Sequence, residues 1–181
     1  MDDVVVVNYD PEWPQAFEAL RSTIWDAVSD IAVSVEHVGS TAVPGLSAKP
    51  VIDIDVVVDE GVVAAGVSRL SSLGYEHRGD LGIPGREAFR SPPDTPRHHL
   101  YLCIAGSPAL ANHLAVRDYL RANPVAASDY SDLKRRLASE HPKDIDSYVE
   151  AKSDFLVGIL HEVGFAPEAL AEIRRMNRKP Q

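Results

Sequence analysis

Alternating and continuous apolar runs mark the strands of this chain. A run of four to eight β-branched residues between turn residues is typical of a buried strand, and strict alternation is typical of a half-buried one. The clearest candidates are residues 33–38, 51–58 and 98–104, and weaker ones are residues 75–78 and 86–91. Residues 4–7, a run of valines, fit an edge strand or an extended arm.

Apolar residues at helical spacing predict helices in the rest of the chain. In the first half, a helix is expected to begin at Pro11, with Asp10 as its N-cap, and its apolar face runs from Trp13 to Val28. A second helix follows residues 59–61 and ends at Gly74. After residue 107 only helical spacing remains. Four helices are predicted there. The first ends near residue 123, the second ends near residue 141, the third spans residues 145–159 and the fourth spans residues 168–176.

Strands that alternate with helices, followed by helices alone, predict an α+β fold. We expect a single domain over residues 1–181. Its sheet core, of mixed or antiparallel strands flanked by helices, would lie at about residues 1–106, and a C-terminal helical annex at about residues 107–176.

Composition narrows the classes of function. The formal net charge of −9 argues against a general nucleic-acid binder, which would need a basic surface. Cys103 is the only cysteine, so an internal disulfide and a cysteine-based zinc cluster are both excluded, and a buried, inert thiol is expected. No apolar run approaches the ~20 residues that cross a bilayer, and the start of the chain lacks the pattern of a signal peptide. We therefore expect a cytoplasmic protein without membrane association.

The candidate chemistry lies in the buried strand at residues 51–58. Asp53 and Asp55 are two positions apart, so their side chains point to the same face of the strand, about 7 Å apart along it. Carboxylates on an otherwise apolar strand are costly unless a proton, a cation or several donors compensate them. Such a pair can hold one divalent ion, or two that a substrate bridges. Mg²⁺ suits it, because Mg²⁺ takes few protein carboxylates and leaves its other positions to water and phosphate; Mn²⁺ is the substitute.

A glycine-serine turn precedes this strand and supplies the complement to its acids. At Gly39 a phosphate can approach the backbone closely, and the exposed N–H groups and the Ser40 hydroxyl can accept its charge. Taken alone, the turn and the aspartates could also be structural, with Asp53 and Asp55 at a solvated sheet edge. Their combination at this spacing favours a phosphate site.

A Gly-Ser turn followed by Asp-x-Asp on a strand resembles the signature of the nucleotidyltransferase superfamily related to DNA polymerase β. The longer strings resemble the GrpB family in particular; they are residues 37–46, 49–54, 85–90, 98–103 and 117–121. The resemblance covers nearly the whole chain and implies a nucleotidyltransferase-like fold. In activity it implies a metal-dependent enzyme that moves a nucleoside monophosphate from a nucleoside triphosphate to a small-molecule or protein acceptor. A related domain is fused to dephospho-CoA kinase in some bacteria, where it is thought to assist folding.

One feature of that superfamily is absent. Its members carry a third carboxylate on a later strand, where this chain has His98, His99 and Tyr101. Period two places His99 and Tyr101 on one face and His98 on the more apolar other face, so His99 is the candidate for the site. It would complete a metal shell or act as a general base, or else be a structural histidine.

The candidates for triphosphate binding are basic residues near these motifs or on apolar helix faces: Lys49, Arg86, Arg117 and Lys152. Each is also explained by an ordinary solvated charge. His37 would lie beside the phosphate turn or serve a structural role. The run Lys134-Arg135-Arg136 is read as a solvated helix face.

Two hypotheses remain open. The first is the nucleotidyltransferase, with a nucleoside triphosphate and an unidentified acceptor as partners. The second is a non-catalytic module that binds nucleotides or assists the folding of an enzyme of coenzyme A biosynthesis. A homodimer is compatible with either.

Overall fold

A five-stranded sheet forms the centre of the protein in the computed structural model, which describes residues 3–177. The strands are β1 (Ala32–Val38), β2 (Ile52–Val58), β3 (Glu76–His77), β4 (Arg86–Arg90) and β5 (His98–Ile104), in the spatial order β1-β2-β5-β4-β3. β2 and β5 are parallel, and the other neighbours are antiparallel. The predicted strands and the α+β class are confirmed.

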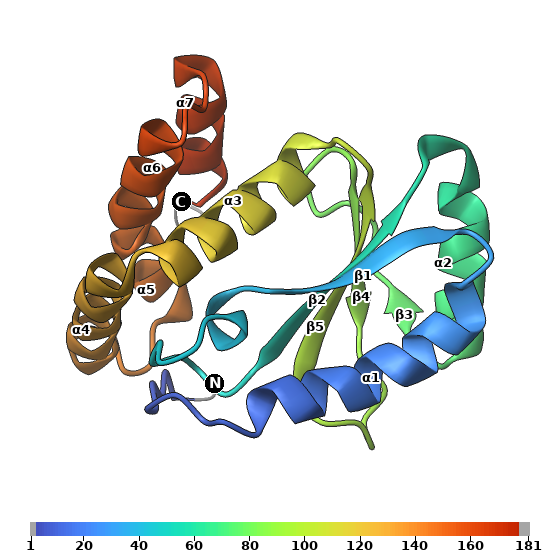
Figure 1. The fold of residues 1–181 in the computed structure, drawn as a ribbon, viewed down its shortest axis with the longest axis horizontal. Helices are drawn as coiled ribbons and strands as arrows, with labels where there is room; N and C mark the ends of the chain where they lie inside the picture. The colour runs from blue at the N-terminus through green and yellow to red at the C-terminus, as the bar shows by residue number, and fades with distance from the viewer. Residues whose placement is uncertain (1–2, 178–181) are drawn as a thin grey trace.

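Residues 3–177 form seven α-helices. They are α1 (Trp13–Val28), α2 (Val63–Ser72), α3 (Pro108–Ala122), α4 (Pro124–Glu140), α5 (Ile145–Ala151), α6 (Ser153–Glu162) and α7 (Pro167–Met176). Of these, α1 and α2 pack on one side of the sheet, α3 lies on the other, and α4–α7 form a group beyond α3 (Figure 1). Two short 3₁₀ turns, Ser40–Ala42 and Glu60–Val62, follow β1 and β2. None of the described helices is long and apolar enough to span a membrane.

One face of the sheet packs on α1 and α2, and we call it the closed face. It is mainly apolar: Ile54 and Val56 of β2 and Leu100 of β5 point to it and are buried in one cluster with the apolar stripe of α1. That stripe has the helical period predicted from the sequence, with Trp13, Phe17, Leu20, Ile24 and Val28 all buried. Because both surfaces are apolar, burial alone accounts for this packing.

The other face of the sheet, which we call the open face, carries the polar residues and lies towards α3 (Figure 1). In register, Asp53 of β2 is beside His99 of β5, and Asp55 is beside Tyr101. On the other side of β2, Asp55 is opposite Glu36 of β1. Residues opposite one another in a ladder share a face, so these side chains point the same way.

Three details differ from the prediction. α1 begins at Trp13 rather than at Pro11, because Asp10 instead accepts a hydrogen bond from the Glu12 N–H in the preceding turn. The predicted helix over residues 145–159 is two helices that meet at Lys152. There the Ser153 hydroxyl donates to the Val149 carbonyl, a contact that bends helices. Residues 4–7 are an extended arm, and its β-bridge joins Val7 to Ala48 in the loop before β2.

Candidate functional site

The two aspartates of β2 differ in their exposure. The Asp53 side chain is 28% exposed, whereas Asp55 is fully buried. The Oδ1 atom of Asp55 has no hydrogen-bond partner among the described residues. A buried carboxylate oxygen without a partner is costly, so its retention points to a cation or donor that compensates it in the working protein.

The turn after β1 packs directly against Asp53. Gly39 has a φ of +70°, a conformation that favours glycine, and a Cβ built on it would lie 2.2 Å from Asp53 Oδ2. Any larger residue would therefore both strain the backbone and displace the carboxylate. The backbone conformation and the close approach of Asp53 thus both require glycine at position 39. The same turn places Ser40 at the cavity that Asp53 lines.

Each aspartate is held by one imidazole. His99 Nδ1 lies 2.8 Å from Asp53 Oδ1, so the structure brings the predicted pair together. His113 of α3, which sequence reasoning missed, lies with Nδ1 2.7 Å from Asp55 Oδ2. Burial acts to lower the pKa of His113, but the hydrogen bond and the charge of Asp55 outweigh it and raise the pKa. The signal in the sequence was its place three residues after the buried Leu110 on α3.

A cavity of about 330 Å³ opens beside Asp53 between the open face and the helices. Gly39, Ser40 and Tyr101 line its sheet side, and Tyr130 and Lys152 line its helical side. The cavity therefore joins the phosphate turn and the exposed aspartate to a lysine that the sequence singled out. Its size is within the range of small-molecule sites.

Lys152 is in the lining of this cavity, and Lys49 lines a separate pocket with Pro50 and Arg97. Lys49 and Lys152 both approach the ring of Tyr148, with their Nζ atoms 5.9 Å and 5.2 Å from its centroid. Burial, and then the charge of Lys49, lower the pKa of Lys152 to about 8, while Asp53 acts to raise it. Burial also lowers the pKa of Lys49. An anion bound beside Lys152 would offset the repulsion that the charge of Lys49 exerts on it.

Lys134 corrects the prediction of a solvated basic face on α4. Its neighbours Arg135 and Arg136 are exposed, but Lys134 is only 2% exposed and its Nζ has no hydrogen-bond partner among the described residues. The ammonium lies over the Tyr130 ring, 4.4 Å from its centroid. Burial, together with Lys152 and Arg135, lowers its pKa to about 6. The spacing of Tyr130, Lys134 and Leu137 places all three on one helix face, a signal present in the sequence.

The two arginines predicted to bind phosphate lie elsewhere. Arg117 of α3 donates to Glu36 Oε2 at 2.8 Å and to the carbonyl of His37, so it anchors α3 to β1. Arg86 of β4 lies over the Tyr101 ring, 4.4 Å from its centroid, and lines a separate pocket. Neither lines the cavity beside Asp53. Of the basic residues predicted to bind phosphate, Lys152 is therefore the one that lines this cavity.

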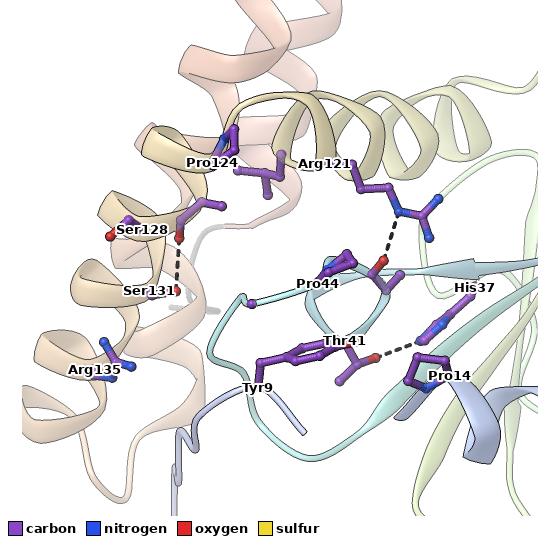
Figure 2. Close-up of a pocket in the computed structure, with 14 residues that line it drawn as sticks. Tyr9, Pro14, His37, Thr41, Pro44, Arg121, Pro124, Ser128, Ser131 and Arg135 are labelled. Carbon is purple, nitrogen blue, oxygen red and sulfur yellow. Dashed lines mark hydrogen bonds between the residues drawn. The ribbon is translucent and has the colours of Figure 1, made fainter. Parts of the chain in front are cut away.

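His37 points to the closed face rather than to Asp53. Its ring stacks on Phe17 with centroids 4.6 Å apart, and its Nε2 lies 3.0 Å from the Thr41 hydroxyl. Figure 2 shows His37 and Thr41 in the lining of a pocket. This pocket has a volume of about 730 Å³ and lies between the start of α1, the loop after β1 and the α3–α4 junction. There Arg121 Nε donates to the carbonyl of Ala42. His37 therefore supports the turn structurally.

Cys103 and His98 match the positions predicted for them. Cys103 is fully buried, and burial with the neighbouring Asp55 raises the pKa of its thiol, so the thiol is inert. His98 faces the closed side, where Nε2 lies 2.8 Å from the Tyr75 hydroxyl. The β5 positions beside the aspartates are thus His99 and Tyr101, and no acid stands there.

The donor set suits Mg²⁺ better than zinc. Within residues 3–177 no group of three or more His, Cys, Asp or Glu side chains converges in the manner of a protein metal cage. Mg²⁺ needs no such cage, because one or two carboxylates with water and phosphate suffice. The unpartnered Oδ1 of Asp55 supplies an oxygen that such an ion would satisfy. The imidazoles on the other oxygens would orient the carboxylates.

Comparison with known proteins gives a family and a fold. The sequence profile of the family described as GrpB protein matches residues 3–162. The UPF0157 protein YqkA of Bacillus subtilis is 32% identical over 154 residues, covering 84% of this chain and 45% of that protein. A dephospho-CoA kinase of Mycolicibacterium paratuberculosis is 31% identical over 175 residues, covering 82% of this chain and 43% of the kinase. The chain thus spans less than half of these two relatives.

Two solved structures place the fold. The GrpB protein of Enterococcus faecalis superposes with a TM-score of 0.78 at 36% identity, covering 93% of this chain and 98% of that one. The Cid1 poly(U) polymerase, in a structure with MgATP bound, superposes with a TM-score of 0.53 at 14% identity, covering 74% of this chain and 44% of that one. The fold is therefore nucleotidyltransferase-like.

Proposed function

The chain belongs to the GrpB family, and on that premise we propose that it is a metal-dependent nucleotidyltransferase. It would bind a nucleoside triphosphate in the cavity beside Asp53 and transfer the nucleoside monophosphate to a small-molecule or protein acceptor. The observation that carries the proposal is the arrangement on the open face. A glycine-serine turn packs on Asp53, one of two aspartates of a single strand, and Lys152 lines the same cavity as Asp53.

The turn and the lysines would bind the triphosphate. Gly39 admits phosphate to the backbone, and the Ser40 hydroxyl donates to it. Lys152 lines the same cavity, and Lys49 is close enough for its charge to act on Lys152. A phosphate would also relieve the mutual repulsion of these lysines, which burial alone does not.

Asp53 and Asp55 would hold the divalent ion, which neutralises phosphate charge when bound. The acceptor oxygen forms a bond to the α-phosphorus as the bond between this phosphorus and the pyrophosphate oxygen breaks. Pyrophosphate leaves with that electron pair, and the acceptor proton passes to a base. His99 is suited to this role, because a donating Nδ1–H toward Asp53 leaves the lone pair on Nε2. Positioning and charge neutralisation provide most of the catalysis in such reactions.

Calorimetric titration of ATP, GTP, CTP and UTP, each with and without Mg²⁺, tests the proposal. We expect magnesium-dependent binding of at least one triphosphate to the wild type. Binding should weaken at least tenfold in the Asp53→Asn/Asp55→Asn variant. The matched control is Asp59→Asn, an exposed aspartate just beyond the other end of β2, which should bind as the wild type does. Equal binding by all three proteins would overturn the proposed site.

A second function has one observation in its favour. The dephospho-CoA kinases that resemble this chain contain the similar segment as part of a longer protein. A module that supports the folding or activity of such an enzyme would not need the aspartates. Co-expression with a dephospho-CoA kinase separates the two functions. If Asp53→Asn/Asp55→Asn supports kinase yield as well as the wild type and neither binds triphosphates, the second function is favoured.

A further inference from the structure

A second, more apolar pocket of about 410 Å³ lies beside the aspartate cavity. Its walls come from the loop before β4, the start of α3 and α7, and its apolar lining includes Ile83, Pro84, Phe165, Ile173 and Met176. The volume suits the body of a small molecule about the size of two fused rings. Such a lining can exclude water from an apolar group, but it does not by itself identify the ligand.

The position of the pocket relates it to the aspartates. Asn112 and His113 line both this pocket and the aspartate cavity. His113 also binds Asp55 at 2.7 Å, so one side chain separates the apolar pocket from the buried carboxylate. A molecule in the pocket would therefore meet a nucleotide in the neighbouring cavity near β2.

Arg86 supplies the charge of the pocket. Its guanidinium lies over Tyr101, makes no ion pair with a described residue, and has a buried Nε without a hydrogen-bond partner. Glu172, the acid in the lining, is instead bound to Arg175 at 2.5 Å. A lone arginine beside an apolar wall is complementary to a ligand with one apolar body and one carboxylate.

We propose that this pocket binds the acceptor, and that the acceptor is a small hydroxy acid with an aromatic or similarly bulky apolar body. Arg86 binds its carboxylate, the apolar walls hold its body, and its hydroxyl lies near His113 at the boundary with the nucleotide. This inference rests on the proposed function for the identity of the acceptor, although the pocket can be tested without any nucleotide. The transfer step has the same balance of bonds and proton as given above.

The test uses a matched pair of probes, 1-naphthoate and its neutral analogue 1-naphthamide, titrated into the full chain by saturation-transfer NMR. The two have the same shape and differ in charge. We expect naphthoate to bind the wild type at least fivefold more tightly than naphthamide. Arg86→Met, which keeps the volume, should abolish that preference. The control is Arg90→Met on the same strand, whose arginine is exposed and bound to Glu76, and it should keep the preference.

A second variant tests the location of the probe. Ala169→Trp places a large side chain in the pocket lining and should abolish binding of both probes, with folding checked by circular dichroism. Equal affinity for the two probes, or binding that survives Ala169→Trp, would overturn the inference. A parallel MgATP titration of the wild type keeps the two proposals apart. If MgATP does not bind, magnesium GTP, CTP and UTP are titrated in the same way. Probe binding without binding of any of the four rejects the nucleotidyltransferase, and triphosphate binding without probe binding rejects only the acceptor pocket.

Discussion

The two faces of the sheet differ in how their buried polar groups are satisfied. On the closed face, His98 has partners in Tyr75, Ser91 and the carbonyl of Pro96, and His37 has one in Thr41. On the open-face side lie all three buried side-chain atoms that lack a partner among residues 3–177: Asp55 Oδ1, Arg86 Nε and Lys134 Nζ. The buried polar groups named here therefore have hydrogen-bond partners on the closed face and lack them on the open-face side.

This difference separates packing from function. Buried polar groups without partners cost about 1–3 kcal/mol each, so a protein retains them where a ligand completes them. Apolar burial on the closed face stabilises the protein. On the open face, polar groups without partners lower the stability but are available to bind a ligand. Mutations should therefore have opposite effects on the two faces.

The largest expected effect is on the closed face. Leu100 of β5 is fully buried in the apolar cluster that the sheet forms with α1 and α2, so Leu100→Ala removes apolar contacts and leaves a cavity. We expect a loss of about 2–5 kcal/mol in the free energy of unfolding, measured with urea. A loss below about 1 kcal/mol would contradict the assignment of the closed face as the main core.

The next effect concerns the turn that faces Asp53. Gly39→Ala should cost about 1–3 kcal/mol of stability and abolish binding of magnesium nucleotides, because its Cβ would displace the Asp53 carboxylate. Gly45→Ala is the matched control, since Gly45 has a similar φ of +79° but open space around its Cβ position. The control should show the strain without the loss of binding. Similar binding losses in both variants would place the effect in the backbone alone.

A gain in stability is expected at Lys134. Because burial holds its pKa at about 6, against 10.5 for an ordinary lysine, the unfolded chain binds an extra proton there between these pH values. This residue thus makes stability rise with pH across that window. Lys134→Met should remove the slope, stabilise the protein by about 1–3 kcal/mol at pH 6 and weaken triphosphate binding. Arg136→Met, at an exposed neighbour, should change little, and a destabilised Lys134→Met would refute the account.

The smallest expected effect concerns His37 and the fall in folding stability at low pH, which we call the acid limb. Burial lowers the pKa of His37 from 6.5 to about 4; the charge of Asp53 acts to raise it, and the charges of Arg121 and Arg117 act to lower it further. The unfolded chain therefore binds an extra proton between about pH 4 and 6.5, and stability falls as the pH drops through that window. His37→Gln should flatten this limb at a cost of about 1 kcal/mol at pH 7, as followed by thermal unfolding. An unchanged acid limb would show that other groups control it.

Much of this fold could be predicted, because β2, β5 and α1 have clear periods. The pairing of Asp53 with His99 followed from their shared face once β2 and β5 were neighbours. His113 could not be placed, since its contact with Asp55 spans 58 residues and depends on the angle at which α3 crosses the sheet. Lys134 could have been found from its helical spacing, but a run of three basic residues suggested a solvated face.

The break at Lys152 was hidden for a different reason. Apolar residues continue in helical period on both sides of it, and only the Ser153 hydroxyl, bound to Val149, marks the bend. The bend separates α5 from α6 at the residue that lines the cavity with Asp53. Local sequence therefore predicted the strands that carry the acids better than the helices that carry the cations.

The central claim is that the cavity beside Asp53 binds a magnesium nucleotide. Thermal unfolding of the wild type and of Asp53→Asn/Asp55→Asn, each with MgATP, with ATP and a chelator, and with no addition, tests it most directly. The claim predicts a rise in Tm with MgATP for the wild type alone, by the stabilisation that a ligand of the folded state gives. The same experiment with GTP, CTP and UTP covers the other bases. If no magnesium nucleotide raises the Tm of the wild type, or if the double variant responds equally, the claim is contradicted.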